Sequence, residues 1–297
     1  MLKLTLLISG NLGYEILQYL FKKDIVKIVS IFTDYNSETI IDFANNNNIR
    51  IFIGNPRKQK NKITNFLNEI GETDLIFSIN YLFIIEKELI NYPKLFALNI
   101  HGSLLPKYRG RTPHVWAIIN GETKTGITVH RINEGVDTGD ILLQKEIVIE
   151  HKDTGNDILR KYNKIYPELV ERSLILIKEN KTRFTKQDEE KATYFGKRTP
   201  SDGEINWNWT KERIYNWVRA QAKPYPGAFT FYKDKKIIID KIEFSDYGFN
   251  YNDINGKILN ISQKIIKVSN GAVKIVSYRF NENKDNFIFK DNTILGK

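Results

Sequence analysis

LKLTLLISGNLGYEILQYLFKKDIVKIVSIFT (2–33) decides the fold, because it reads as one strand–helix–strand unit. Its first eight residues form a mostly apolar run, which is typical of a strand buried on both faces. GNLG (10–13) predicts a turn, and YEILQYLFKK (14–23) has the apolar spacing of a helix. IVKIVSIFT (25–33) supplies a second buried strand. This order predicts parallel strands joined by a helix that covers the sheet.

The same alternation continues to residue 100. SETIIDFANNN (37–47) predicts a helix with Ser37 as its N-cap, and another helix is expected at 61–69. The remaining predicted strands are IRIFIG (49–54), DLIFSI (74–79) and LFALNI (95–100). We therefore expect an α/β domain with a Rossmann-like, mostly parallel sheet flanked by helices. In such sheets, ligands lie beyond the carboxyl ends of the strands.

The second half of the chain has a different character. A long helix is expected at 154–178, and residues 181–203, rich in Lys, Thr, Asp and Gly, predict a linker. After a helix expected at 207–221, short runs such as KIIIDKIEF and GAVKIVSYRF predict a smaller β-rich, barrel-like domain. The expected organisation is a catalytic domain at 1–180, the linker, and a C-terminal domain at 204–297.

Composition excludes several classes of protein. The chain has 297 residues, 41% hydrophobic, and no cysteine, which excludes disulfide scaffolds, thiolate metal sites and thiol nucleophiles. The first apolar run stops at Ser9, and no run approaches the ~20 residues that span a bilayer, so we expect a cytoplasmic protein without a membrane segment. The four histidines are scattered, which predicts no metal site, and His114 and His130 are assigned no role.

The net charge of +10 is unevenly distributed. Residues 1–150 carry 17 Lys+Arg and 16 Asp+Glu, whereas residues 151–297 carry 28 and 19. A basic surface suits phosphate-bearing partners, namely a nucleotide, a nucleic acid or an anionic membrane. A Lys-rich solvated surface explains the same charge equally well, so both interpretations stay open.

LNIHGSLLPKYRGRTPHVWAI (98–118) concentrates polar residues just after a predicted strand. Asn99 and His101 are two residues apart, so continued strand geometry points both side chains the same way. An Asn amide can donate to a developing oxyanion, and an imidazole can accept a proton near neutral pH. Asp137, in the turn NEGVDTGD, adds a carboxylate that can orient the imidazole or relay a proton. Taken alone, such residues beside turns are more often structural than catalytic.

The longer pattern is more specific. N-I-H-x-S-L-L-P-K-Y-R-G-x-x-P (99–113), followed by D-T-G-D (137–140), resembles the folate-dependent formyltransferases. That family includes methionyl-tRNA, glycinamide ribonucleotide and nucleotide-sugar formyltransferases. YFGKRTPSDGEINW (194–207), VRAQAKPYPGAF (218–229) and GKILNISQKIIKVSNGAVKI (256–275) resemble its tRNA and sugar branches. The resemblance therefore covers most of the chain.

The resemblance implies transfer of a one-carbon unit to an amine. Asn99, His101 and Asp137 match the family's catalytic triad, and the implied donor is 10-formyltetrahydrofolate, with no metal. The implied folate contacts are Phe83, Ile84, Ile85, Gly135 and Val136. The acceptor contacts predicted from the residues themselves are Ser9, Gly10, Asn11, Lys197, Arg198 and Tyr225. Relatives often carry a basic residue after the tyrosine matched by Tyr81, whereas this chain has Leu82.

Two of the predicted acceptor contacts have plain alternatives. The GNLG segment can hold a pyrophosphate on main-chain N–H groups at a helix N-terminus, and a tight turn explains it as well. Tyr225, between two prolines, can stack on a pyrimidine ring or pack within its domain.

The acceptor decides the biology. Relatives that formylate tRNA carry a long basic loop after the second strand, where this chain has TDYNSETIIDF (33–43), without Lys or Arg. The segment R-x-P-x-x-W (111–116) is similar to the sugar-nucleotide branch. We therefore expect formyl transfer to a dTDP-linked amino-deoxysugar, with dTDP-4-amino-4,6-dideoxyglucose favoured, for O-antigen or another surface polysaccharide. A homodimer is expected, without nucleic-acid or membrane partners. The alternatives are a methionyl-tRNA formyltransferase, a formyl-folate hydrolase, and a non-catalytic nucleotide- or nucleic-acid-binding protein.

Overall fold

The computed structural model describes residues 1–233, 235–280, 289 and 293–296. They fall into two compact units, each assembled from separate stretches of the chain. The first unit comprises Met1–Gly110, Gly126–Ile147 and Lys161–Tyr194, and the second comprises Arg111–Thr125, Val148–Arg160 and Phe195–Lys297. This division differs from the boundaries predicted at residues 180 and 204, because two earlier segments group with C-terminal residues. The assignment of residues 1–180 to a catalytic domain and of residues 204–297 to a C-terminal domain stays a prediction.

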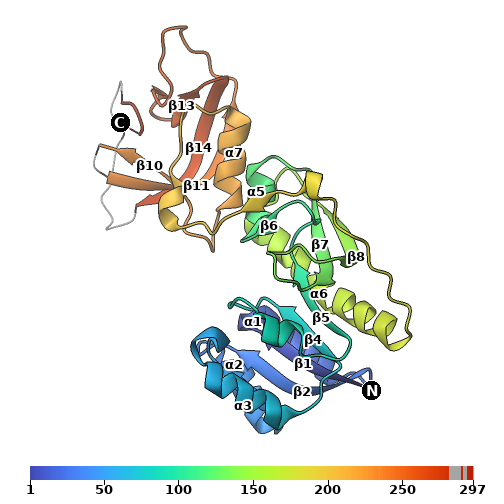
Figure 1. Cartoon of the computed structure of the whole chain (residues 1–297). Helices are drawn as coiled ribbons and strands as arrows, with labels where there is room; N and C mark the ends of the chain where they lie inside the picture. Colours follow the sequence, from blue (N-terminus) through green and yellow to red (C-terminus); the bar gives the residue numbers. More distant parts are fainter. Residues whose placement is uncertain (234, 281–288, 290–292, 297) are drawn as a thin grey trace. The chain divides into compact units, whose positions relative to one another are not determined.

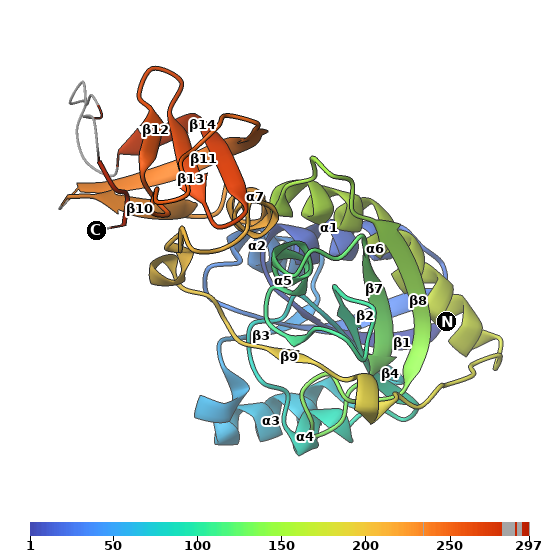
Figure 2. The same cartoon turned by 90° about the horizontal axis from the view of Figure 1, so that it is seen from above.

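A seven-stranded sheet organises the first unit, in the order β3-β2-β1-β4-β5-β7-β8. The first five of these strands pair in parallel, whereas β7 runs antiparallel to β5. Figure 1 shows β1, β2, β4 and β5 side by side, and Figure 2 shows β7 beside β8. The strands are β1 (Leu2–Ile8), β2 (Val26–Thr33), β3 (Arg50–Ile53), β4 (Leu75–Ile79), β5 (Phe96–His101), β7 (Lys124–Arg131) and β8 (Ile141–Val148). The predicted α/β fold with a mostly parallel sheet is confirmed.

Helices cover both faces of this sheet. Leu7 and Ile8 are adjacent in β1 and therefore point to opposite faces. Leu7 belongs to a buried cluster that includes Ile63 and Leu67 of α3, whereas Ile8 lies under α1. A Cβ atom at Gly13 of α1 would stand 2.9 Å from the Ile8 Cβ, so only glycine allows this close approach. The helices of this part are α1 (Gly10–Phe21), α2 (Glu38–Asn46), α3 (Lys60–Ile70), α4 (Lys87–Ile90) and α6 (Gly155–Lys178).

The prediction of a separate GNLG turn was wrong, since these residues form the first turn of α1. Ser9 is extended, with φ −145°, and Gly10 has φ +62°. Glycine enters this left-handed region at no steric cost, so the chain passes directly from strand into helix. Ser37 stands at the predicted N-cap of α2, and its hydroxyl accepts the Gly10 N–H at 2.9 Å and donates to the Asp34 Oδ2 at 2.7 Å.

An antiparallel five-stranded sheet, in the order β10-β11-β14-β13-β12, forms most of the second unit and packs against α7 (Figures 1 and 2). The helix predicted at 207–221 begins later, because Thr210 caps α7 by accepting the Arg213 N–H at 3.3 Å. Trp207 precedes the helix and donates to the Thr230 hydroxyl at 2.9 Å. The elements are α5 (Pro113–Ile119), α7 (Lys211–Ala220), β10 (Ala228–Tyr232), β11 (Lys235–Ser245), β12 (Ile258–Asn260), β13 (Ile265–Val268) and β14 (Gly271–Phe280).

The residues predicted as a linker contain short ordered elements. They include β9 (Tyr194–Phe195) and the 3-10 helices Glu189–Lys191 and Pro200–Gly203, and the main-chain N–H of Arg109 in β6 (Arg109–Gly110) donates to the Thr193 carbonyl at 2.8 Å. Within the described residues, no helix has the length and apolar character required to cross a membrane. The same part of the chain has no group of three or more His, Asp and Glu side chains placed to hold a metal ion.

Candidate active site

Strand β5 carries two of the predicted site residues. Asn99 and His101 alternate with Ile100, which is 4% exposed and belongs to the core. The antiparallel neighbour β7 places His130 directly opposite Asn99, and Thr128 opposite His101. Residues directly opposite in paired strands share one face of the sheet. His130 therefore lies on the same face as the two predicted residues.

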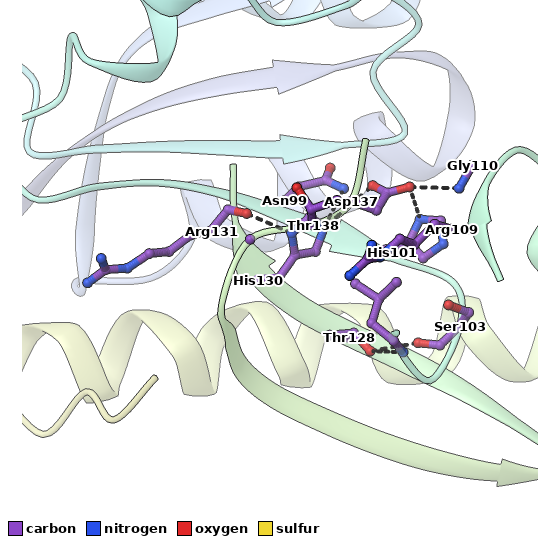
Figure 3. Close-up of polar contacts among 12 residues, drawn as sticks. Asn99, His101, Ser103, Arg109, Gly110, Thr128, His130, Arg131, Asp137 and Thr138 are labelled. Atoms are coloured by element: carbon purple, nitrogen blue, oxygen red, sulfur yellow. Dashed lines mark hydrogen bonds and ion pairs between the residues drawn. The ribbon is translucent and has the colours of Figure 1, made fainter. Parts of the chain in front are cut away.

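Asp137 reaches this face from the loop that follows β7. Its backbone has φ +54°, in the left-handed region, and its side chain is 14% exposed. The Gly110 N–H donates to the Asp137 Oδ2 at 2.9 Å. The Asp137 carboxylate also lies 3.4 Å from the His101 Nδ1 and 3.6 Å from the His130 Nε2. Figure 3 shows these side chains gathered with Asn99. The structure thus brings together the three residues predicted from the sequence.

The contacts of His101 define where its proton sits. Its Nε2 is 2.8 Å from the Tyr108 carbonyl oxygen, which can only accept, so Nε2 carries the hydrogen. The Nδ1 atom, facing Asp137, is then the basic atom of the neutral ring. Burial lowers the pKa of His101, and the Asp137 charge and the Tyr108 carbonyl only partly oppose that shift. His101 is therefore a neutral base at neutral pH, and Asp137 can stabilise its protonated form.

The Asp137 carboxyl is ionised under the same conditions. Burial raises the pKa of Asp137, but His101, His130 and the Gly110 N–H together outweigh burial, and the pKa lies well below its usual range. A fixed negative charge beside an imidazole can orient the ring and favour uptake of a proton at Nδ1.

His130 orients the Asn99 amide. The His130 Nδ1 is 2.7 Å from the Arg131 carbonyl and therefore carries the hydrogen. The His130 Nε2 can then accept the Asn99 Nδ2 hydrogen, at 3.2 Å. An amide nitrogen carries two N–H groups, so the second can serve an oxyanion. Sequence reasoning assigned His130 no role. Only the pairing of β5 with β7 identifies His130 as a partner of Asn99. That pairing cannot be read from the sequence until the order of the strands in the sheet is known.

The predicted folate contacts occupy two adjacent loops of the first unit. Phe83, Ile84 and Ile85 follow β4, and Ile84 is 63% exposed. Gly135 and Val136 lie in the loop before Asp137, and Val136 is 60% exposed. The Lys87 Nζ, just after the first loop, is 2.9 Å from the Glu134 Oε1, just before the second. Exposed apolar side chains on tethered loops suit the binding of a flat heterocycle, and the contacts themselves stay a prediction.

The predicted acceptor contacts at the end of β1 are partly engaged within the protein. Ser9 is 1% exposed, and its carbonyl accepts the Asn80 Nδ2 hydrogen at 3.0 Å. The Gly10 N–H, offered above for a pyrophosphate, already donates to Ser37. Asn11 is exposed at the start of α1. These residues stay predicted contacts, with the main chain at Gly10 the least available.

The other three predicted acceptor contacts belong to the second unit. Lys197 is exposed, whereas the Arg198 guanidinium lies 4.4 Å from the Trp217 ring centroid and donates to the Gln221 Oε1 at 2.8 Å. The Tyr225 hydroxyl lies 2.6 Å from the His114 Nε2. Tyr225 also lines a hollow of about 680 Å³ with Asn156, Arg160, Lys223, Pro224, Pro226 and Arg279. Arg198 is thus held by packing, and Tyr225 is the better placed of the two.

Stability at mildly acidic pH is expected to depend on His114. This side chain is 8% exposed in α5, and burial lowers the pKa of His114 to about 4. Unfolded histidine has a pKa of about 6.5, so the unfolded chain binds more protons in the window between these values. The contribution of neutral His114 to stability is complete above pH ~6.5 and is lost as the pH falls toward 4. At ~1.4 kcal/mol per pKa unit, that loss is about 3 kcal/mol.

His114→Gln should remove this pH dependence. Urea unfolding at pH 7 and pH 4, followed by tryptophan fluorescence, reports on the second unit, because all four Trp lie there. The difference in free energy of unfolding between the two pH values should shrink by about 3 kcal/mol in the variant. The exposed His151→Gln is the matched control. An unchanged difference in His114→Gln would contradict this account.

Comparisons with known proteins identify the family. The family model described as formyl transferase matches residues 3–174, which is more than half of the chain. The chain belongs to the formyl transferase family. The model of the formyl transferase C-terminal domain matches residues 197–286. The first match includes the strands of the seven-stranded sheet, and the second, which begins within the segment predicted as a linker, includes those of the five-stranded sheet.

One relative is similar to this chain in sequence, and two solved structures are similar to it in fold. The bifunctional polymyxin resistance protein ArnA of Wigglesworthia glossinidia brevipalpis is 42% identical over 213 residues, covering 70% of this chain and 32% of ArnA. The chain thus spans about a third of the length of that relative. WlaRD, a sugar 3N-formyl transferase solved in the presence of dTDP and 5-N-formyl-THF, is 24% identical, with a TM-score of 0.68. The match covers 96% of this chain and 99% of WlaRD. The N-formyltransferase of Helicobacter canadensis, complexed with folinic acid and dTDP-3-aminofucose, is 22% identical, with a TM-score of 0.69. The match covers 93% of this chain and 99% of the Helicobacter enzyme.

Proposed function

We propose that this chain transfers the formyl group of 10-formyltetrahydrofolate to the amino group of a dTDP-linked amino-deoxysugar. One observation carries the proposal: an Asn99 amide, a neutral His101 base and an ionised Asp137 meet on one face of the sheet. The folate compounds and dTDP ligands named for WlaRD and the Helicobacter enzyme support the choice of donor and acceptor. Within this class, dTDP-4-amino-4,6-dideoxyglucose is the favoured acceptor, and a 3-amino sugar is the nearest alternative.

The proposed chemistry assigns each group one task. The acceptor amine attacks the formyl carbon, and the carbonyl electrons move to its oxygen. The Asn99 Nδ2 donates to that oxyanion, while the His101 Nδ1 takes the proton that the nitrogen loses. Asp137 stabilises the imidazolium across 3.4 Å. When the bond between carbon and the folate nitrogen breaks, the imidazolium returns the proton to that nitrogen, giving the formamide and tetrahydrofolate.

The loop after β2 favours a sugar over tRNA. Enzymes that bind a polyanion form many Lys and Arg contacts with phosphates. Here Asp34, Glu38 and Asp42 are the charged residues between positions 33 and 43. The Asp34 carboxylate accepts hydrogen bonds from the Asn36 N–H at 2.9 Å and the Ser37 hydroxyl at 2.7 Å, which keeps the connection to α2 short. Asp34 is buried, and the exposed charges of this region, Glu38 and Asp42 of α2, are acidic where a tRNA ligand needs cations.

The test is formylation of a panel of acceptors by the full chain with 10-formyltetrahydrofolate, read by mass spectrometry. The panel contains dTDP-, UDP- and GDP-linked 3- and 4-amino sugars, charged initiator tRNA and dTDP-glucose, which has no amine. Formylation of a dTDP-amino sugar is expected. Formylation of tRNA only would overturn the proposal, formate release without acceptor would show a hydrolase, and no turnover with any acceptor would favour a binding protein.

Thermal shift separates the nucleotides independently of turnover. A ligand that binds the folded state raises stability by RT ln(1 + [L]/Kd), so dTDP should raise the melting temperature more than UDP or GDP. A role in O-antigen or other surface polysaccharide synthesis, a cytoplasmic location and a homodimer also stay predictions, and light scattering of the purified chain tests the last.

A further inference from the structure

Arg109 is the most deeply buried charged side chain beside the site, with 0% exposure. Its guanidinium donates through Nε and Nη2 to the Gln187 Oε1, at 3.2 and 2.8 Å. It also donates through Nη1 and Nη2 to the Glu189 carboxylate, at 2.8 and 2.7 Å, and through Nη1 to the Tyr194 hydroxyl. A guanidinium has five N–H groups, so every donor of Arg109 is used. Glu189 alone neutralises the charge of Arg109. The two hydrogen bonds from Arg109 to Gln187 therefore need a separate explanation.

Gln187 passes this contact on to the loop that carries Asp137. The side chain of Gln187 is 5% exposed, and its Nε2 donates to the carbonyl oxygens of Asp137 and Gly139, at 2.8 and 2.7 Å. A glutamine amide has two N–H groups and two acceptor lone pairs. All four are used, with Arg109 on the oxygen and the Asp137 loop on the nitrogen. The amide orientation is therefore fixed. A reversed amide would place its N–H groups against the Arg109 guanidinium and its oxygen against the Asp137 and Gly139 carbonyls.

Asp137 needs such support because of its backbone. A non-glycine residue at φ +54° is strained by about 1–3 kcal/mol, and surrounding contacts must hold it there. The segment after His101 holds Asp137 in two ways. The Gly110 N–H binds the carboxylate directly, and Arg109 binds the main chain through Gln187. Relaxation of this backbone would move the carboxylate away from the His101 Nδ1.

We propose that Gln187, oriented by Arg109, is a positioning residue that fixes the Asp137 carboxylate against the His101 Nδ1. This inference rests on the function proposed above. Loss of the hydrogen bonds from Gln187 to the Asp137 and Gly139 carbonyls should lower kcat about 10- to 100-fold, because small misplacements of catalytic groups have effects of that size. KM should change less than kcat, since Gln187 donates to the carbonyls of Asp137 and Gly139 and not to Gly135 or Val136, the predicted folate contacts of the same loop.

Two variants of Gln187 separate positioning from folding. Gln187→Met removes all four hydrogen bonds at similar volume. Gln187→Glu keeps an acceptor for Arg109 but cannot donate to the Asp137 and Gly139 carbonyls, so it should fold and still lose kcat to the same extent. Thr73→Val is the matched control, because Thr73 is 1% exposed and donates to main-chain carbonyls at 3.1 Å in the first unit, on the loop before β4. It should lower the melting temperature and leave kcat unchanged.

A second readout does not depend on turnover. The Asp137 charge raises the pKa of His101, so displacement of the carboxylate should lower it. NMR titration of the His101 ring, assigned by single substitution of the four His, measures this shift in wild type, Gln187→Met and Gln187→Glu. The acid limb of the kcat/KM profile should move to lower pH with it.

The outcomes are distinct. The inference is supported if the pKa of His101 is lower in both Gln187 variants and unchanged in Thr73→Val. If the wild-type chain also formylates none of the acceptors, only the proposed function fails. An unchanged His101 pKa in Gln187→Glu overturns the inference. So does a loss of activity that tracks the melting temperature across all three variants, because that result shows a purely structural glutamine.

Discussion

His101→Ala is expected to lower kcat for sugar formylation about 10³-fold, within the 10²–10⁴ range of a positioned general base. The described part of the site offers no equivalent replacement, because Asp137 is a weak base and the His130 Nε2 is taken up by the Asn99 amide. The acid limb of the wild-type kcat/KM profile should lie below pH ~6.5, since burial lowers the pKa of His101.

Steady-state assays of purified His101→Ala should be paired with circular dichroism and melting temperature. Removing the ring leaves the Tyr108 carbonyl without its donor, so some loss of stability is expected, and His101→Asn, which retains polar atoms, serves as the second variant. Added imidazole should restore part of the activity of His101→Ala. Activity within tenfold of wild type in both folded variants would rule out His101 as the base.

Asn99→Ala is expected to lower kcat about 10²–10³-fold, the loss seen when one oxyanion donor is removed. The donor acts on charge that exists only after attack, so kcat and kcat/KM should fall together while KM changes little. Asn99→Asp tests the reason for this loss, because it keeps the size of the side chain and replaces the donor by an acceptor.

Asn99→Asp should be no more active than Asn99→Ala. It also places a second carboxylate near Asp137, which opposes the oxyanion. Single-turnover assays with saturating folate measure the chemical step directly. Recovery of activity in Asn99→Asp would instead show that Asn99 serves packing and the orientation of His130.

Local periodicity predicted most of the sheet and half of the site. The apolar runs gave the parallel strands, and the spacing of two between Asn99 and His101 predicted their common face without knowledge of the tertiary structure. His130 could not be assigned this way, because it becomes a partner of Asn99 only through the antiparallel pairing of β7 with β5. Strand order depends on packing across the whole unit and leaves no mark in a local window.

The segment predicted as a linker shows a second limit. Its Lys-, Thr- and Asp-rich composition indicated a connection on the surface, yet Gln187 within it is 5% exposed and touches residues about fifty positions earlier. Composition describes average solvation, whereas one buried glutamine is specified by four hydrogen bonds that come from distant parts of the chain. The start of α1 failed for a related reason, since Gly10 and Gly13 signalled a turn but serve helix entry and close packing.

The left-handed backbone at position 137 limits the residues that can replace aspartate there. Aspartate and asparagine enter this region at a lower cost than other non-glycine residues, whereas glutamate has no such advantage. Asparagine keeps the conformation and loses the charge, and glutamate keeps the charge and loses the conformation. No single replacement meets both requirements, so aspartate is isolated from its mutational neighbours by geometry as much as by chemistry.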